Sequence, residues 1–293
     1  MSNMVVRTNV LALNSHRNLG NVANNQARSS SRLSSGFRIN SAADDAAGLA
    51  ISENMRAQIR GLDQASRNAQ DGISVLQTAD GVLATVREMA QRIRELAVQG
   101  SNDTYNDDNR GRIEQEMQSL VDEIEDTLDR ARFGANDEGL LFSTGSAAAG
   151  GMLGGGDFFL QVGANSDEAM TINIATEVGQ LFTDLAALDT ALTGSLDSHS
   201  DFTSLLDGAI QDLLDSVADL ATEIGVFQNR LEFTIQNVDI ASENLSAAES
   251  RIRDADMAKE MMRLTQSNVL QQAATSMLAQ ANQAPQSVLQ LLG

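Results

Sequence analysis

The sequence predicts a mainly α-helical protein, a long antiparallel coiled-coil rod formed by the N- and C-terminal halves, with a small β-hairpin region inserted in the middle. Three observations predict this class. Apolar residues recur at alternating spacings of three and four, which is typical of helices packed in coiled coils. Only one of 293 residues is Pro, which breaks helix interiors, so very long helices are permitted. Aromatic residues are only 3% of the chain, which favours an aliphatic helical core.

The N-terminal segment is expected to form a helix that ends at Gly36, because glycine is the usual residue just past a helix C-terminus. Asn40 and Ser41 can cap the next helix, and two Asp residues shortly after them suit its positively polarised start.

Two further helices are expected in the first half of the chain. Gly100 can end the first, and Asn106 can cap the second. The apolar seam of the first consists of Leu62, Ala65, Ala69, Gly72, Leu76, Ala79, Leu83, Val86, Ala90, Ile93 and Ala97. That of the second consists of Ile113, Met117, Leu120, Ile124, Thr127 and Ala131.

The middle of the chain changes character. Glycine is dense in 145–163, and residues 158–162 and 170–174 are predicted to be two strands joined by a turn at 163–167. Residues 178–205 show no clear pattern and are expected to form short helix and loop.

The longest seam lies in the second half and predicts a helical rod of roughly 60 Å. It runs through Ile210, Leu213, Val217, Leu220, Ile224, Phe227, Leu231, Thr234, Val238, Ala241, Leu245, Ala248 and Ile252. Because helices flank a β insertion, the two halves must pair to bury their seams. We expect a rod core of Leu76, Leu83, Val86, Ile93, Leu213, Val217, Leu220, Ile224, Phe227 and Leu231.

The ends of the chain, about 1–40 and 257–293, are rich in Ser, Asn and Gln and have small core residues. Isolated helices of this kind are marginal in water, so we expect them to be disordered in the monomer and to fold against another subunit. The predicted assembly seam of the C-terminal segment is Leu270, Ala274, Met277, Ala281, Val288 and Leu291.

Charge is unevenly distributed along a chain whose net charge is −20. Residues 1–43 hold five Arg and no acid, 44–256 hold 13 basic and 39 acidic residues, and 133–229 hold no Lys or Arg. An acidic middle argues against a nucleic-acid partner, because no basic stripe exists to neutralise phosphates. Acid-poor ends suit burial in an assembly, since buried charge is costly.

The sequence offers no catalytic chemistry. There is no Cys, the two His lie far apart, and the common metal, phosphate-binding and nucleophile motifs are absent. We therefore expect no enzyme, cofactor or metal site. No signal peptide and no apolar run long enough to span a membrane is visible.

Several long motifs closely resemble bacterial flagellins and occur in the family's order. They are LSSGFRINSAADDAAGLAI at 33–51, NAQDGIS at 68–74, the turn QVGANSDE at 161–168, SRIRDADMAKE at 250–260 and QANQAPQSVL at 280–289. The resemblance covers roughly 1–176 and 205–293. One departure is Phe133-Gly134-Ala135-Asn136, where family members usually carry Phe-Asn-Gly, which leaves the local turn open.

The resemblance implies a layered architecture. Segments 1–43 and 257–293 would form an inner assembly layer, 44–176 the N-terminal rod helices with the hairpin, and 205–256 the C-terminal rod helix. Residues 177–204 would be a short variable outer segment.

The resemblance also implies a secreted, extracellular subunit that polymerises with itself into the flagellar filament for swimming motility. Export would use the flagellar type III channel, with an export chaperone on the C-terminal segment, and the filament cap and hook-associated proteins would be further partners. The vertebrate Toll-like flagellin receptor reads a patch of the family's rod helices. The matching positions are Gln91, Arg92, Ile93, Arg94, Glu95, Leu96 and Glu116.

Three alternatives differ from this interpretation. A hook–filament junction protein, which is flagellin-like and hook-associated, has similar ends, but the terminal motifs and the QVGAN turn favour flagellin. An enzyme-bearing flagellin would need a longer middle with metal ligands. A free coiled-coil adhesin or scaffold would not need two acid-poor, weakly folded ends.

Overall fold

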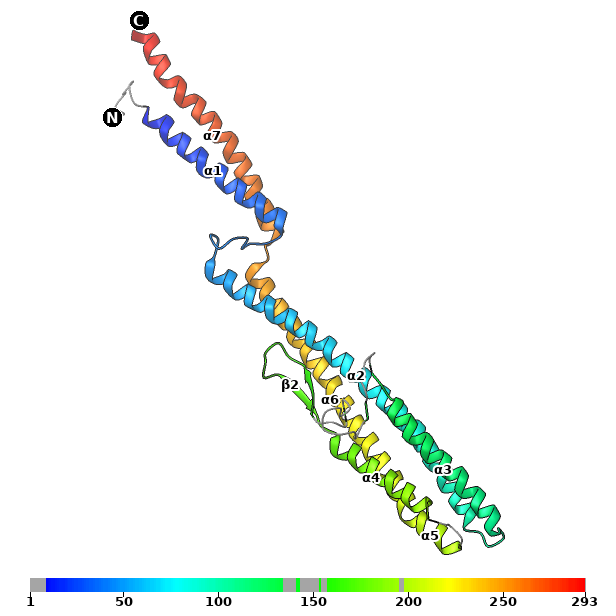
Figure 1. Ribbon diagram of the computed structural model, residues 1–293. Coiled ribbons are helices and arrows are strands. Elements are labelled where there is room, and N and C mark those ends of the chain that lie inside the picture. The colour runs from blue at the N-terminus through cyan, green and yellow to red at the C-terminus, as the bar shows by residue number, and fades with distance from the viewer. Residues whose placement is uncertain (1–8, 134–140, 143–152, 154–156, 195–197, 293) are drawn as a thin grey trace. The chain divides into compact units, whose positions relative to one another are not determined.

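The computed structural model describes residues 9–133, 141–142, 153, 157–194 and 198–292, with side chains as far as residue 283. The fold is 81% helical with a small two-stranded antiparallel sheet, which confirms the predicted fold class (Figure 1). The chain divides into two compact units, 1–58 with 243–293 and 59–242. We call them the terminal unit and the bundle unit.

In the terminal unit, helices α1 (Val10–Ser35) and α7 (Met257–Leu292) lie side by side. The Asn9 side chain caps α1 by accepting a hydrogen bond from the backbone N–H of Ala12, and Gly36 ends the helix with φ of 75°. Only glycine adopts that backbone conformation without strain. The predicted end of the N-terminal helix is therefore correct.

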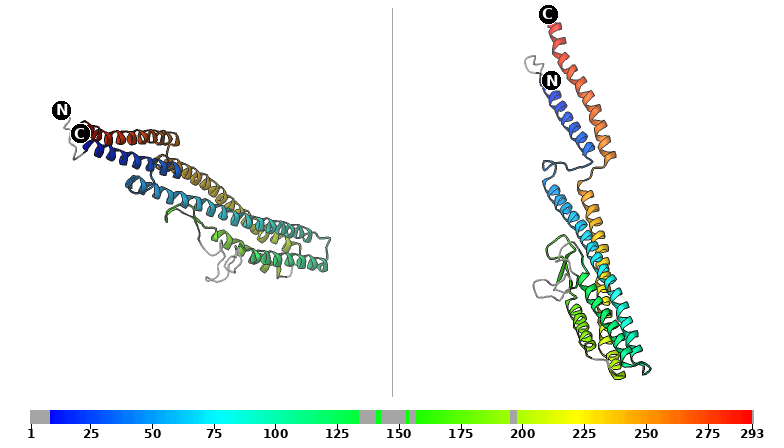
Figure 2. Two further views of the ribbon diagram at one scale, coloured as in Figure 1. Left: turned by 90° about the horizontal axis from the view of Figure 1, so that it is seen from above. Right: turned by 45° about the vertical axis from the view of Figure 1, so that its right-hand side comes forward.

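The bundle unit is built around the antiparallel pair of α2 (Ala46–Gly100) and α6 (Ala209–Arg253), both of which continue into the terminal unit. Helices α3 (Asp107–Arg130) and α4 (Ala175–Leu192) run alongside this pair, and α5 (His199–Asp207) is short (Figure 2). As predicted, α2 ends at Gly100 and the side chain of Asn106 caps α3.

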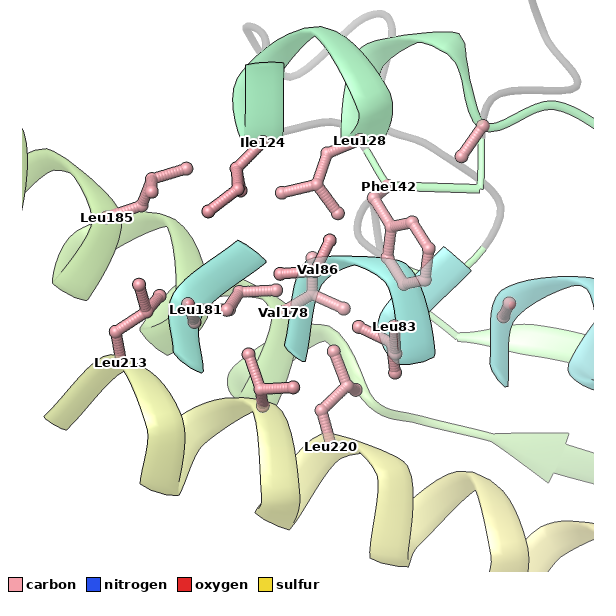
Figure 3. Packing of buried hydrophobic residues seen from close by; sticks show 14 of the residues in the cluster. Leu83, Val86, Ile124, Leu128, Phe142, Val178, Leu181, Leu185, Leu213 and Leu220 are labelled. Atoms are coloured by element: carbon pink, nitrogen blue, oxygen red, sulfur yellow. The ribbon is translucent and has the colours of Figure 1, made fainter. Parts of the chain in front are cut away.

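The core of the bundle unit draws side chains from four helices, as Figure 3 shows. Leu83 of α2 and Leu220 of α6 both belong to it and are fully buried. The remaining labelled residues come from α2, α3, α4, α6 and the segment after α3: Val86, Ile124, Leu128, Phe142, Val178, Leu181, Leu185 and Leu213.

Three local expectations differ from the structure in detail. Helix α2 begins later than predicted, and Asp45 caps it by accepting a hydrogen bond of 2.9 Å from the Gly48 N–H. On α3, Val121 and Leu128 are buried in place of two predicted seam residues, which are only half-buried. The segment expected to be short helix and loop forms α4 and α5, and five apolar residues of α4 are buried: Val178, Leu181, Leu185, Leu188 and Leu192.

The predicted hairpin consists of β1 (Phe158–Gln161) and β2 (Ala169–Ile172), with Leu160 paired to Met170. It packs on α2 at two glycines, since a Cβ on Gly72 would lie 2.5 Å from Leu160 and one on Gly61 would lie 2.8 Å from Ala164. Most of the glycine-dense segment, and the turn beginning at Gly134, lie outside the described residues.

Candidate interaction surfaces

The face by which α1 and α7 contact each other consists mainly of small and polar residues. The Gln26 amide donates to the Asn268 side chain at 2.7 Å, and the Asn9 amide donates to the Ala281 carbonyl at 2.7 Å. The shielded positions again alternate by three and four. They are Ala12, Ser15, Leu19, Val22, Gln26, Ser29 and Leu33 on α1, and Glu260, Leu264, Ser267, Gln271, Ala274, Leu278 and Ala281 on α7.

Large apolar residues of both helices remain outside this contact. On α1 they are Val10, Leu11 and Leu13, and on α7 they are Met257, Met261, Met262, Val269, Leu270 and Met277, all between 47% and 66% exposed. Exposed apolar residues clustered in this way mark interaction surfaces. The terminal unit thus presents these nine large apolar side chains to its surroundings.

Some residues of the predicted assembly seam lie on the face of α7 that contacts α1, and others lie on its exposed face. Ala281 is buried and Ala274 half-buried on the side facing α1, whereas Leu270 and Met277 are exposed. The side chains of Val288 and Leu291 lie outside the described part of the chain. The expectation that each terminal segment needs another subunit as its first partner differs from the structure, in which α1 and α7 contact each other.

The connections after α1 and before α7 are joined to each other. Phe37 and Asp254 form an antiparallel bridge, the Arg38 N–H donates to the Arg253 carbonyl at 2.6 Å, and the Ala255 N–H donates to the Gly36 carbonyl at 2.9 Å. The Arg253 guanidinium lies 4.8 Å from the centre of the Phe37 ring. These contacts fix where α1 ends and where α7 begins.

The loop before α2 is organised by Asp44. Its carboxylate accepts hydrogen bonds from the backbone N–H groups of Asn40 at 3.3 Å and Ser41 at 3.2 Å, and lies 3.7 Å from Arg32. The Asn40 N–H, followed by the Ser41 groups and Arg32, lowers the pKa of Asp44 against the opposing effect of burial. Asn40 and Ser41 thus donate to an acid within the loop and do not cap α2.

All ten residues of the predicted rod core are buried in the bundle unit, with exposed fractions from 0% to 5%. Ionic and polar pairs along α2 and α6 fix the antiparallel register. The Ser242 hydroxyl donates to Asp63 at 3.1 Å within the bundle unit, and Arg56 pairs with Glu249 at 3.2 Å within the terminal unit.

The predicted receptor patch contains an exposed ion-pair network. Arg92 donates to Glu116 of α3 at 3.0 Å and to Glu95 at 3.1 Å, and all three side chains are about half-exposed or more. The hydrogen bonds to Glu116 and then to Glu95 raise the pKa of Arg92. Ile93 and Leu96 are buried, so they support this surface from below and cannot themselves contact a receptor.

Acidic side chains crowd together where α3 faces α4. Burial, and then the charge of Asp189 and of acids on α3, raise the pKa of Glu125. Gln118 of α3 donates a hydrogen bond of 2.6 Å to Asp189 of α4. The described residues contain no group of His, Cys, Asp and Glu arranged to hold a metal ion, and none of their helices has the length and apolarity of a membrane span.

Comparison with known proteins gives a consistent family. The model of the bacterial flagellin N-terminal helical region matches residues 6–143, and that of the C-terminal helical region matches 207–292. The chain is 51% identical over 290 residues to a flagellin of Halalkalibacterium halodurans, covering 99% of this chain and 100% of that protein. It is 42% identical over 289 residues to a flagellar filament core protein of Treponema maltophilum, with coverage of 99% and 100%.

A solved structure from Vibrio parahaemolyticus, of a protein proposed to be flagellar hook-associated, shares the fold. Its TM-score is 0.56 at 19% identity, over 72% of this chain and 100% of that one.

Proposed function

The chain belongs to the bacterial flagellin family, and from this premise we propose how its surfaces serve that family's function. It is a non-catalytic structural subunit that polymerises with itself into the extracellular flagellar filament and associates with flagellar hook-associated proteins. The comparisons do not support a hook–filament junction protein better than a filament subunit.

We propose that assembly proceeds through the terminal helices. The observation that carries this proposal is the apolar surface that the α1–α7 pair leaves uncovered. The pair shields a mixture of small, polar and aliphatic residues, while six large apolar residues of α7 are exposed. Covering such side chains with another subunit removes apolar surface from water, which drives association. Deletion of either terminal helix tests this proposal.

We further propose two specific partners that the family resemblance implies, an export chaperone and the filament cap. The apolar face of α7 is a surface that an export chaperone can cover before assembly, which suits passage through a type III channel. A neighbouring subunit would cover the same face in the filament, so the chaperone and that subunit would compete for it. The filament cap would meet this surface as each subunit is added.

Receptor recognition is proposed for the exposed part of the patch, which consists of Gln91, Arg92, Arg94, Glu95 and Glu116. Replacing Arg92 by Ala is expected to raise the concentration of monomer needed for half-maximal receptor signalling by roughly tenfold, as for an interfacial Arg. Helix content should not change, because the side chain is exposed. Arg67→Ala, on the same helix but away from the patch, is the control and should signal like the unmodified chain. Equal signalling by both variants would remove Arg92 from the receptor site.

Salt is expected to promote filament growth. Residues 133–229 carry 15 acids and no Lys or Arg, and neighbouring subunits bring these regions together. Like-charge repulsion acts over about 10 Å at 0.1 M ionic strength and about 3 Å at 1 M. Apolar contacts are not weakened by salt. The critical concentration for polymerisation should therefore fall as NaCl rises from a few millimolar to 1 M. An increase would show that ion pairs between subunits dominate assembly.

A further inference from the structure

Methionine supplies most of the large apolar side chains that α7 leaves uncovered. Four of these six side chains are methionines, with exposed fractions from 47% to 66%: Met257, Met261, Met262 and Met277. We call them the α7 methionines. The surface that assembly is proposed to cover is therefore rich in thioether groups that solvent can reach.

The other methionines in the described part of the chain are shielded. Met117 is fully buried, and Met55, Met89 and Met170 are half-buried. The chain has no Cys, so methionine is its only sulfur-containing residue. A dissolved oxidant must reach a sulfur atom to react with it. Among the described residues, the α7 methionines are therefore the sulfur groups that an oxidant meets first.

We propose that the α7 methionines form a reversible oxidation site that controls whether a monomer can join a filament. The inference rests on the proposed assembly through the terminal helices, and the oxidant that it requires is a peroxide such as hydrogen peroxide. The methionine sulfur attacks one peroxide oxygen, so that an S–O bond forms while the O–O bond breaks. The sulfur is oxidised to a sulfoxide, the transferred oxygen gives up its proton to the departing oxygen, and the peroxide is reduced to water.

Oxidation changes the polarity of the surface without removing any contact within the monomer. A sulfoxide oxygen is a polar acceptor, and burying it against apolar groups without a hydrogen-bond donor is unfavourable. Because the side chains of the α7 methionines are exposed, the contact between α1 and α7 does not depend on them. The oxidised monomer should therefore keep its helices and lose affinity for the filament. Methionine sulfoxide reductases return the sulfoxide to the thioether, which makes the change reversible.

The test places oxidised and unoxidised copies of the unmodified chain in competition. Monomers are partially oxidised with hydrogen peroxide, freed of peroxide and polymerised, and sedimentation separates the filaments from the remaining monomer. Trypsin digestion and peptide mass spectrometry then locate the sulfoxides in each fraction. Because trypsin cleaves after Lys and Arg, the α7 methionines fall in peptides 254–259, 260–263 and 264–293. Met89, which packs against the bundle core, lies in peptide 88–92 and is the internal control.

The proposal predicts that sulfoxides of the α7 methionines are at least roughly tenfold more abundant in the remaining monomer than in filaments, since each makes the apolar contact less favourable. The sulfoxide of Met89 should differ between the fractions by less than about threefold. Treating the remaining monomer with the reductases for both sulfoxide epimers and a thiol reductant should restore polymerisation.

Three results would overturn this proposal. They are equal abundance of the α7 sulfoxides in both fractions, equally strong exclusion of the Met89 sulfoxide, and monomer that stays inactive after the reductases have removed the α7 sulfoxides. Failure of the untreated chain to form filaments would instead contradict the subunit function on which the inference rests.

Discussion

A chain lacking residues 257–293 is expected to stay soluble and helical but to form no filaments under conditions in which the full chain polymerises. The deletion removes all the exposed apolar side chains of α7 and also the partner of α1. The bundle unit keeps its own core, so its helices should remain folded. Sedimentation and electron microscopy measure the loss of polymer, and circular dichroism measures the retained helix. A chain lacking residues 1–40 should behave in the same way.

Point substitutions test the exposed apolar residues of α7 without removing the helix that contacts α1. A chain with Val269→Ser and Met277→Ser loses two exposed apolar residues of α7 and should polymerise poorly. The control carries Gln266→Ser and Gln280→Ser, which change exposed polar residues of the same helix. Filaments of normal length from either deletion, or equal polymerisation by the two double variants, would contradict assembly through the ends.

Replacing Phe227 by Ala is expected to destabilise the bundle unit by about 3–5 kcal/mol, the usual cost of deleting a buried aromatic side chain. Phe227 is 5% exposed within the core, and the Arg230 guanidinium lies 5.2 Å from its ring centre. Removing the ring leaves a cavity in the core of the bundle unit, and the surrounding helices can close it only in part. Urea unfolding followed by circular dichroism measures the change in the free energy of unfolding.

The same helix supplies the control for this second prediction. Phe233 is 65% exposed, so Phe233→Ala should change the free energy of unfolding by less than about 0.5 kcal/mol. If Phe227→Ala lowers the free energy of unfolding by no more than Phe233→Ala does, Phe227 cannot be the residue of α6 that faces the core.

The paired helices of the bundle unit could be predicted because their repeat is long and strict. From Ala65 to Ala97, every position of the predicted seam on α2 is buried. The sequence also held a clue that this seam was incomplete. Val75 and Leu96 are buried beside it, since α2 contacts more than one helix and needs a wider apolar stripe than a two-stranded coil.

The length and burial of helix α4 were missed although their signal was present. Val178, Leu181, Leu185, Leu188 and Leu192 alternate by three and four like the longer seams, but the run is short and follows the glycine-rich region. The family resemblance assigned the segment 177–204 to a variable outer part. In the structure five apolar residues of α4 are buried in the bundle core. This also explains the shifted register of α3, because α3 must bury side chains toward α4 as well as α2.

The terminal contact could not be predicted from apolar spacing. The face of α7 that meets α1 contains Glu260, Ser267 and Gln271, which a search for apolar residues passes over. Of the apolar positions that such a search finds, Ala274 and Ala281 face α1, whereas Leu270 and Met277 are exposed. Sequence periodicity identified the residues available for burial without telling which partner covers them.

Hydrogen exchange of backbone amides, measured on monomer and on filament, tests assembly through the terminal helices most directly. In the monomer, amides of α1 and α7 should exchange rapidly, because a contact with few fully buried residues leaves both helices close to local opening. In the filament, the same amides should be protected by at least about a hundredfold, while amides at Leu83 and Leu220 in the bundle core change little. Filaments whose α1 and α7 amides exchange as fast as those of the monomer would contradict the account.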